Sequence, residues 1–175
     1  MLGVKSTKNI GITSLFLALA LVLSYIETLL PVFIPIPGLK IGLPNLVIII
    51  ILYLYDLKTA SLINVMRIFI AGFMFGSAFS IVYSLAGAFL SMIIMALMKK
   101  TRKFSIVTVS SAGGIFHNLG QIIMAAIVME NYYIFTYFPV LFIGGLITGI
   151  VIGIIARELL PRLRKIIGFE IKESE

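Results

Sequence analysis

Long apolar runs, separated by short polar or proline-rich stretches, divide the chain into six segments. Most of them approach the roughly 20 residues that an α-helix needs to cross a hydrocarbon core about 30 Å thick. The pattern therefore predicts an all-α, polytopic membrane protein with a bundle of six transmembrane helices. Their expected spans are residues 11–30, 43–55, 59–75, 78–98, 104–129 and 137–156.

The first two segments need separate interpretation. The second is short, so we expect it either to begin near Leu39 with a distortion at Pro44 or to lie where the bilayer thins. The first follows two lysines, as a signal peptide would, but it is too long and no small-residue cleavage site follows it. We expect it to be a retained helix. Residues 1–166 then form one transmembrane domain, and residues 167–175 form a polar cytoplasmic tail.

The composition agrees with a membrane protein. Hydrophobic residues make up 61% of the 175 residues and charged residues 12%, with a mean hydropathy of +1.17. A soluble domain of this length cannot hide so much apolar surface. The net charge of +7 would suggest nucleic acid in a soluble protein. Here the basic residues follow the membrane topology instead, so no nucleic-acid partner is expected.

The basic residues predict the orientation. With six spans and a cytoplasmic N-terminus, the outer side receives only Lys40, and Arg67 falls within a span. Lys and Arg accumulate in cytoplasmic loops, so both termini are predicted to be cytoplasmic. The other 12 of the 14 basic residues lie on the inner side: Lys5, Lys8, Lys58, Lys99, Lys100, Arg102, Lys103, Arg157, Arg162, Arg164, Lys165 and Lys172.

The stretch PVFIPIPGLKIGLP, residues 31–44, joins the first two spans on the outer side. It contains four of the six prolines, so it cannot form a regular helix. It is also apolar, so its side chains need to be covered, and we expect it to fold back over the helix bundle. It is either an anchor at the membrane interface or a lid over an outward-facing pocket.

Small residues recur every four positions on several helices. Because lipid tails are as apolar as leucine, membrane helices associate through such small residues. We expect packing surfaces at residues 76–88 of the fourth span and at residues 145–153 of the sixth. The first span has two small edges, Ser14–Ala18 and Ala20–Ser24, which serve either the bundle or a partner protein.

Arg67 lies near the middle of the third span, one turn from Asn64. An ionisable residue at this depth indicates a functional site, and arginine stays charged. Glu27, near the outer end of the first span, is the only carboxylate that could reach it. Either the two form a buried pair, or Arg67 faces a pocket and binds a carboxylate or phosphate.

The segment GGIFHNLGQIIMAA, residues 113–126, carries three hydrogen-bonding side chains within the fifth span. His117 and Gln121 share one face, and Asn118 lies about 100° away. We predict that these three residues form the floor of a ligand pocket, with bonding between helices as the alternative. Tyr83 and Asn45 are further candidates for its wall.

Several chemistries are excluded by the residue inventory. One aspartate, Asp56, cannot build an acidic Mg²⁺ cluster, and one histidine without cysteine cannot build a zinc site. No span carries two carboxylates and no phosphate-binding loop is present, so catalytic residues, metals and cofactors are not expected.

Three stretches resemble a known family: LALALVLSYIETLLPVFIPIPGLKIGLPNLV, MRIFIAGFMFGSAFSIVYSLAGAFLSMIIMALMKK and SAGGIFHNLGQ. Over about residues 10–156 the chain is similar to the bacterial Gx transporter family, often labelled heptaprenyl diphosphate synthase component I. This family in turn resembles the substrate-binding S components of energy-coupling factor (ECF) transporters.

The resemblance to S components implies six helices in the bacterial cytoplasmic membrane and an outer loop that covers a vitamin pocket. It also implies a transmembrane coupling subunit, driven by ATPases, which docks on a small-xxx-small edge of the first helix. Neither edge here is the alanine-xxx-alanine form. Arg67, His117 and Lys40 would suit an anionic or vitamin-like ligand, and Tyr83 could stack on its ring.

Three functions follow as hypotheses. The first is a substrate-capture subunit of an ECF-type importer. The second is a membrane enzyme or accessory protein of isoprenoid or quinone metabolism, although a single aspartate conflicts with the synthase label. The third is a scaffold for a membrane redox complex, in which Arg67 and Glu27 simply pair.

Overall fold

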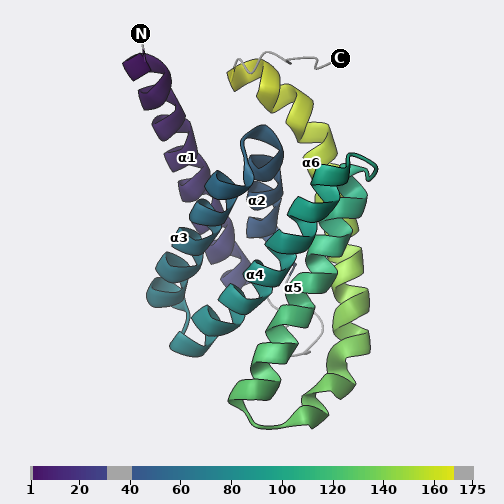
Figure 1. The fold of residues 1–175 in the computed structure, drawn as a ribbon. Coiled ribbons are helices and arrows are strands. Elements are labelled where there is room, and N and C mark those ends of the chain that lie inside the picture. The colour runs from purple at the N-terminus through teal and green to yellow at the C-terminus, as the bar shows by residue number, and fades with distance from the viewer. Residues whose placement is uncertain (1, 31–40, 168–175) are drawn as a thin grey trace.

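The computed structural model describes residues 2–30 and 41–167, and the described part is all-helical. Figure 1 shows the helices running up and down the bundle in chain order. Five of them are long and apolar enough to cross a membrane, and the second has only 12 residues. The elements are α1 (Leu2–Leu29), α2 (Leu43–Leu54), α3 (Leu57–Phe75), α4 (Ala78–Thr101), α5 (Ile106–Val128), a 3₁₀ turn η1 (Tyr132–Tyr137) and α6 (Phe138–Ile167).

The six-helix prediction is confirmed, and two helices are longer than predicted: the first begins at Leu2, not near residue 11. The last helix extends about ten residues beyond the predicted end and includes Pro161. Proline removes one intrahelical hydrogen bond, and α6 bends over its C-terminal part (Figure 1). The first residue of the predicted tail, Ile167, is therefore the last residue of the helix. The remaining tail residues lie outside the described ranges, as do residues 31–40 of the predicted lid.

Helix starts follow the local sequence. Asp56 accepts a hydrogen bond from the Thr59 amide at 2.7 Å, and Ser105 accepts one from Thr108 at 3.2 Å. Ser77 and Ser80 form a reciprocal capping box at the start of α4. These side chains satisfy amides that have no partner within the helix. The short turns that separate α3 from α2 and α4 from α3 are thereby fixed.

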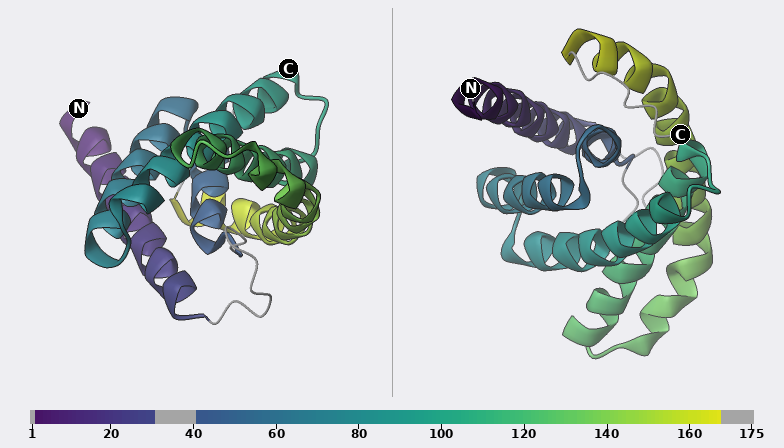
Figure 2. Two further views of the ribbon diagram at one scale, coloured as in Figure 1. Left: turned by 90° about the horizontal axis from the view of Figure 1, so that it is seen from below. Right: turned by 45° about the horizontal axis from the view of Figure 1, so that its top comes forward.

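The short helix α2 is the centre of the apolar core. Residues 47–52 are all at most 4% exposed, so this helix is buried on every side. It packs against α1, α3 and α6, and Figure 2 shows it surrounded by the longer helices. Because its neighbours cover it, it does not need the length of a lipid-facing span.

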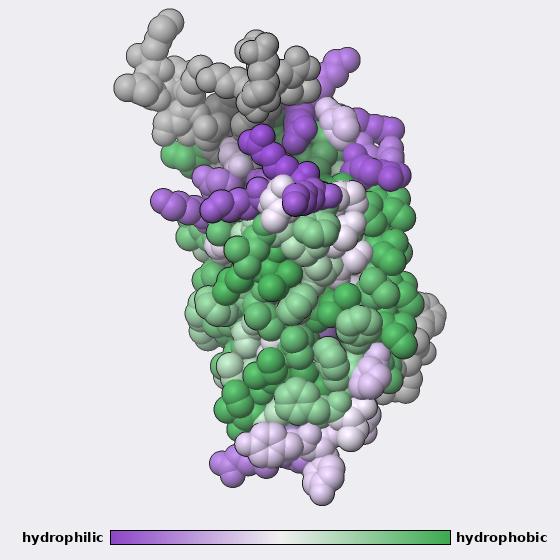
Figure 3. All heavy atoms as spheres, turned by 45° about the vertical axis from the view of Figure 1, so that its right-hand side comes forward, coloured by the Kyte–Doolittle hydropathy of each residue, from purple (hydrophilic) through white to green (hydrophobic). Residues whose placement is uncertain are grey.

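Both described ends of the chain lie at the same end of the bundle, together with the turns that follow α2 and α4 (Figure 1). The basic residues near these turns and at the end of α6 form a polar band above a wide apolar belt (Figure 3). Tyr132 and Tyr133, both more than 80% exposed, lie at the opposite end. The positive-inside rule makes the basic end cytoplasmic, which remains a prediction.

Candidate ligand-binding site

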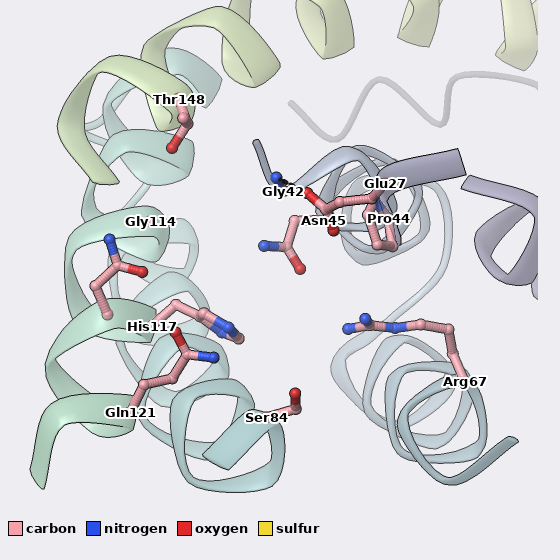
Figure 4. Close-up of a pocket in the computed structure, with 11 residues that line it drawn as sticks. Glu27, Gly42, Pro44, Asn45, Arg67, Ser84, Gly114, His117, Gln121 and Thr148 are labelled. Carbon is pink, nitrogen blue, oxygen red and sulfur yellow. Dashed lines mark hydrogen bonds between the residues drawn. The ribbon is translucent and has the colours of Figure 1, made fainter. Parts of the chain in front are cut away.

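A polar cavity of about 50 Å³ lies inside the bundle, and all six α-helices contribute to its walls. In Figure 4 the side chains of Arg67, His117, Gln121, Ser84 and Asn45 converge on the same space. Most of the wall is able to form hydrogen bonds, which is unusual in the interior of a membrane protein. The lining residues are Glu27, Gly42, Pro44, Asn45, Arg67, Ser84, Gly114, His117, Asn118, Gln121 and Thr148.

Arg67 is the main charged group of this cavity. Its side chain is 9% exposed and extends from α3 toward His117 (Figure 4). One terminal nitrogen, Nη2, donates to Asn64 Oδ1 at 2.5 Å. The Nε atom is buried and has no hydrogen-bond partner among the described residues. A buried donor on a permanent cation without a partner is costly, so the site favours an incoming acceptor.

Glu27 lines the same cavity, and its contacts bear on whether it forms the ion pair with Arg67 that was one of the two alternatives. Its carboxylate accepts hydrogen bonds from the amides of Gly42 and, at 3.3 Å, Leu43. Negative charge at a helix N-terminus is favourable, so Glu27 stabilises the start of α2. Within the described ranges no ion pair of 4 Å or less joins Glu27 to Arg67. Of the two alternatives, this geometry agrees better with Arg67 facing a cavity than with a direct ion pair.

The polar residues of α5 divide between two tasks. Asn118 is 9% exposed, and its Nδ2 donates to the Leu141 carbonyl of α6 at 2.7 Å. It therefore joins helices, as the alternative interpretation proposed, although it also lines the cavity. His117 and Gln121 point toward the open space in Figure 4. The pocket-floor hypothesis thus fits the geometry of these two residues better than that of Asn118.

Gly87 of α4 provides the room that His117 and Gln121 occupy. A Cβ at this position would lie 2.7 Å from the His117 carbonyl oxygen and 2.9 Å from Gln121 Cγ. Such contacts are too short, so only glycine allows α4 and α5 to approach this closely here. The sequence patterns did not indicate Gly87, because it lies outside the four-residue repeat of α4.

Two neighbouring cavities adjoin the first. A larger one, of about 360 Å³, lies between α1, α3 and α4 and shares Glu27, Arg67 and Ser84 with it. A smaller one, of about 30 Å³, shares Asn45, Gly114, His117 and Thr148. Arg67 therefore lies where the polar cavity meets the larger space.

The larger cavity corrects one packing prediction. Gly76, which ends α3, and Ser80 and Ser84 of α4 line it, so this part of the predicted stripe borders open space, not a closely packed helix. The α6 stripe does pack closely: a Cβ on Gly149 would lie 2.6 Å from Ser111 Cα.

Six of the eight predicted ligand residues line the polar cavity, and Tyr83 does not. The Tyr83 ring instead lies 6.4 Å, centroid to centroid, from that of Phe79 on the same helix. Lys40 lies outside the described residues. Ser84 and Thr148 were not predicted as ligand residues, and a weak signal for Thr148 is a lone hydroxyl within the glycine repeat of α6.

Burial separates the two predicted docking edges of α1. Ala20 is fully buried and Ser24 is 7% exposed, so this edge faces the bundle. Ser14 and Ala18 are exposed. Ser24 Oγ also donates to the Ala20 carbonyl at 2.8 Å, which satisfies the buried hydroxyl. Only the Ser14–Ala18 edge is available to a partner.

The cavity has the chemistry of an anion site. It offers the guanidinium of Arg67, the amides of Asn45 and Gln121 and the hydroxyl of Ser84, while its one carboxylate is held by backbone amides. Arginine binds planar carboxylates and phosphates well because its donors form a rigid fork. The described residues include no group of three or more His, Cys, Asp or Glu side chains placed to hold a metal ion.

Comparison with known families identifies the chain. The family model described as heptaprenyl diphosphate synthase component I matches residues 16–159, which is most of the sequence, and the chain belongs to this family. No curated protein and no solved structure gives a significant match.

Proposed function

We propose that this member of the heptaprenyl diphosphate synthase component I family is a substrate-binding membrane subunit that captures a small anionic ligand for uptake. The single observation that carries this proposal is the buried guanidinium of Arg67, directed into a polar cavity with its Nε unpartnered among the described residues. A structural arginine would be expected to have its donors satisfied by the protein.

The two adjoining cavities can receive different parts of one ligand. The 50 Å³ cavity has room for an acidic head group beside Arg67, Gln121 and Ser84. The 360 Å³ cavity, lined by Phe75, small side chains and several serines, has room for an organic body. A vitamin-like carboxylate or phosphate with one acidic end and a partly polar body fits this arrangement.

Mass spectrometry of small molecules that co-purify with the protein tests the proposal. The wild-type protein should retain an organic anion, and Arg67→Ala should lose it while the protein remains folded. Arg157→Ala is the matched control, because it removes an exposed arginine that pairs with the exposed Glu158 at 3.3 Å, away from the cavity. Retention of the same anion by Arg67→Ala would reject Arg67 as the ligand-binding residue.

The proposal includes a partner on α1. The most apolar stretch of α1 has 17% of its residues buried, the lowest share among the five long helices, and its exposed face carries the Ser14–Ala18 edge. A transmembrane coupling subunit, itself driven by ATPase subunits, would dock there through close helix contact. Ala18→Leu should abolish co-purification of that subunit without unfolding the protein, whereas Ala20→Leu should impair folding because Ala20 is fully buried.

The family description favours a second candidate, an accessory component of prenyl diphosphate synthesis. Such a role would require the protein to bind a prenyl chain or to support product formation by another subunit. Formation of a longer prenyl diphosphate by the purified protein with allylic substrate, Mg²⁺ and its partner, but not by the partner alone, would decide for this candidate.

A further inference from the structure

A separate groove lies at the basic end of the bundle, far along α4 from the polar cavity and from the two cavities that adjoin it. Its volume is about 580 Å³. Its lining combines apolar and basic side chains, and no acidic side chain of the described residues contributes to it. The lining residues are Leu52, Leu57, Ile93, Ala96, Leu97, Lys99, Lys100 and Arg102.

The groove lies at the boundary between hydrocarbon and headgroups. The 24 residues of α4 give a helix about 36 Å long, which is slightly more than a hydrocarbon core of about 30 Å. Its last turn, which carries Lys99 and Lys100, therefore reaches the interface. Figure 3 shows the same change from apolar belt to polar band near this end of the molecule.

An apolar track leads into the groove from the lipid-facing surface of α4. Phe89, Ile93 and Leu97 follow one another every four residues and are 71%, 39% and 57% exposed. Residues at this spacing lie above one another on a helix. An extended hydrocarbon chain could lie along these three side chains and end beside the basic residues.

The three cations are held in different ways. Lys99 Nζ donates to the Leu52 carbonyl at the end of α2 and lies 5.2 Å from the centre of the Tyr53 ring, so its ammonium is positioned. Lys100 and Arg102 are exposed. Arg102 has φ 56°, in the left-handed region where glycine is the usual residue after a helix. The guanidinium group of Arg102 is thereby among the cations that line the groove.

We propose that this groove binds an anionic phospholipid of the adjacent leaflet, with its phosphate at Lys100 and Arg102 beside Lys99 and one acyl chain along Phe89, Ile93 and Leu97. Basic residues at a membrane surface attract anionic lipids in general, but here they border an apolar groove that continues the lipid-facing surface. An acidic protein segment would match the charges but not this continuity with the acyl-chain region. The proposal does not depend on the function proposed for Arg67.

Native mass spectrometry of the full chain, with phosphatidylglycerol or phosphatidylcholine added to the detergent, tests the site. The wild-type protein should retain phosphatidylglycerol selectively. Lys100→Gln with Arg102→Gln should lower this retention by about 30-fold, since two surface cations are removed. Arg162→Gln with Lys165→Gln removes the same charge from the end of α6 and should change retention by less than about threefold.

The apolar track formed by Phe89, Ile93 and Leu97 is tested by a second variant with a matched control. Leu97→Ala should weaken phosphatidylglycerol retention, whereas Leu62→Ala, at a position of α3 that is 61% exposed and outside the groove, should not. The proposal would be overturned if both double variants lost phosphatidylglycerol equally, because general surface charge would then explain the binding. It would also be overturned if the wild-type protein retained phosphatidylcholine as well as phosphatidylglycerol. Unchanged retention in the Lys100→Gln, Arg102→Gln variant would also overturn it and leave the groove to an acidic protein segment.

Discussion

The α5–α6 interface and the space between α1, α3 and α4 are both lined by small residues, yet they are packed in opposite ways. Gly145 and Gly149 bring α6 so close to α5 that a Cβ on Gly149 would lie 2.6 Å from the Ser111 backbone. Gly76, Ser80 and Ser84 instead border a cavity of about 360 Å³. The first region is dense throughout, whereas the second encloses a cavity beside one close contact, where a Cβ on Gly72 would lie 2.1 Å from Ile81 Cγ1.

The difference depends on whether the small residue has a polar group and what lies opposite it. Two backbones without side chains can touch, and their dispersion contacts hold membrane helices together. A serine beside a buried guanidinium can instead maintain a polar space, because both groups interact with a ligand or with water. A repeat of small residues is thus compatible with close packing and with a binding cavity.

The largest expected effect is a difference in protein stability between a substitution in the dense region and one in the region with the cavity. Gly149→Leu should destabilise the protein by about 3 kcal/mol, because the new side chain overlaps the α5 backbone. Ala71→Leu, in the region with the cavity, should change stability by less than about 1 kcal/mol because the cavity accepts the added carbons. Thermal unfolding in detergent measures both. Equal destabilisation by the two variants would remove the distinction between the regions.

The next effect concerns the polar support of Arg67. Asn64→Ala removes the acceptor of the 2.5 Å hydrogen bond, so the free energy of unfolding should fall by about 2 kcal/mol. Affinity for the co-purifying anion should fall about tenfold as the guanidinium loses its orientation. Asn131→Ala, at the exposed start of η1, is the control and should leave affinity unchanged. An Asn64→Ala protein with wild-type affinity would show that Arg67 does not need this positioning.

A smaller effect divides the polar residues of α5. Asn118→Leu should lower stability by about 1 kcal/mol, because the 2.7 Å bond to the α6 carbonyl is lost. Gln121→Leu should preserve stability and reduce anion affinity, because Gln121 faces the cavity. Unfolding and anion retention are measured on both variants. The opposite assignment of the two effects would place the binding surface on the Asn118 side of α5.

The smallest effect provides a reference outside both regions. Hydrogen bonds from Thr59, and to a lesser extent the positive charge of Lys58, hold the pKa of the exposed Asp56 carboxyl below its usual range. A carboxyl with a lowered folded-state pKa stabilises the fold above its unfolded pKa, and this contribution is lost as the pH falls through the folded value. Asp56→Ala should therefore cost about 0.5 kcal/mol near pH 7 and nothing at low pH. If Asp56→Ala left the free energy of unfolding unchanged at every pH, the capping role of Asp56 would be contradicted.

The sequence alone determined the helices and their number, because long apolar runs and capping residues act locally. It also indicated Arg67, His117 and Gln121, since buried polar groups in a membrane span are costly wherever the helices lie. Only the tertiary structure decided which groups meet. It showed that Glu27 caps α2, that Asn118 bonds to α6, and that Ser14–Ala18 is the exposed edge of α1.

These outcomes depend on the rotation of each helix about its axis and on its distance from its neighbours. The same four-residue spacing of small residues occurs on α4 and α6, so periodicity could not distinguish the region with the cavity from the dense one. That distinction arises when the helices pack and the buried charge of Arg67 must be accommodated by the groups around it.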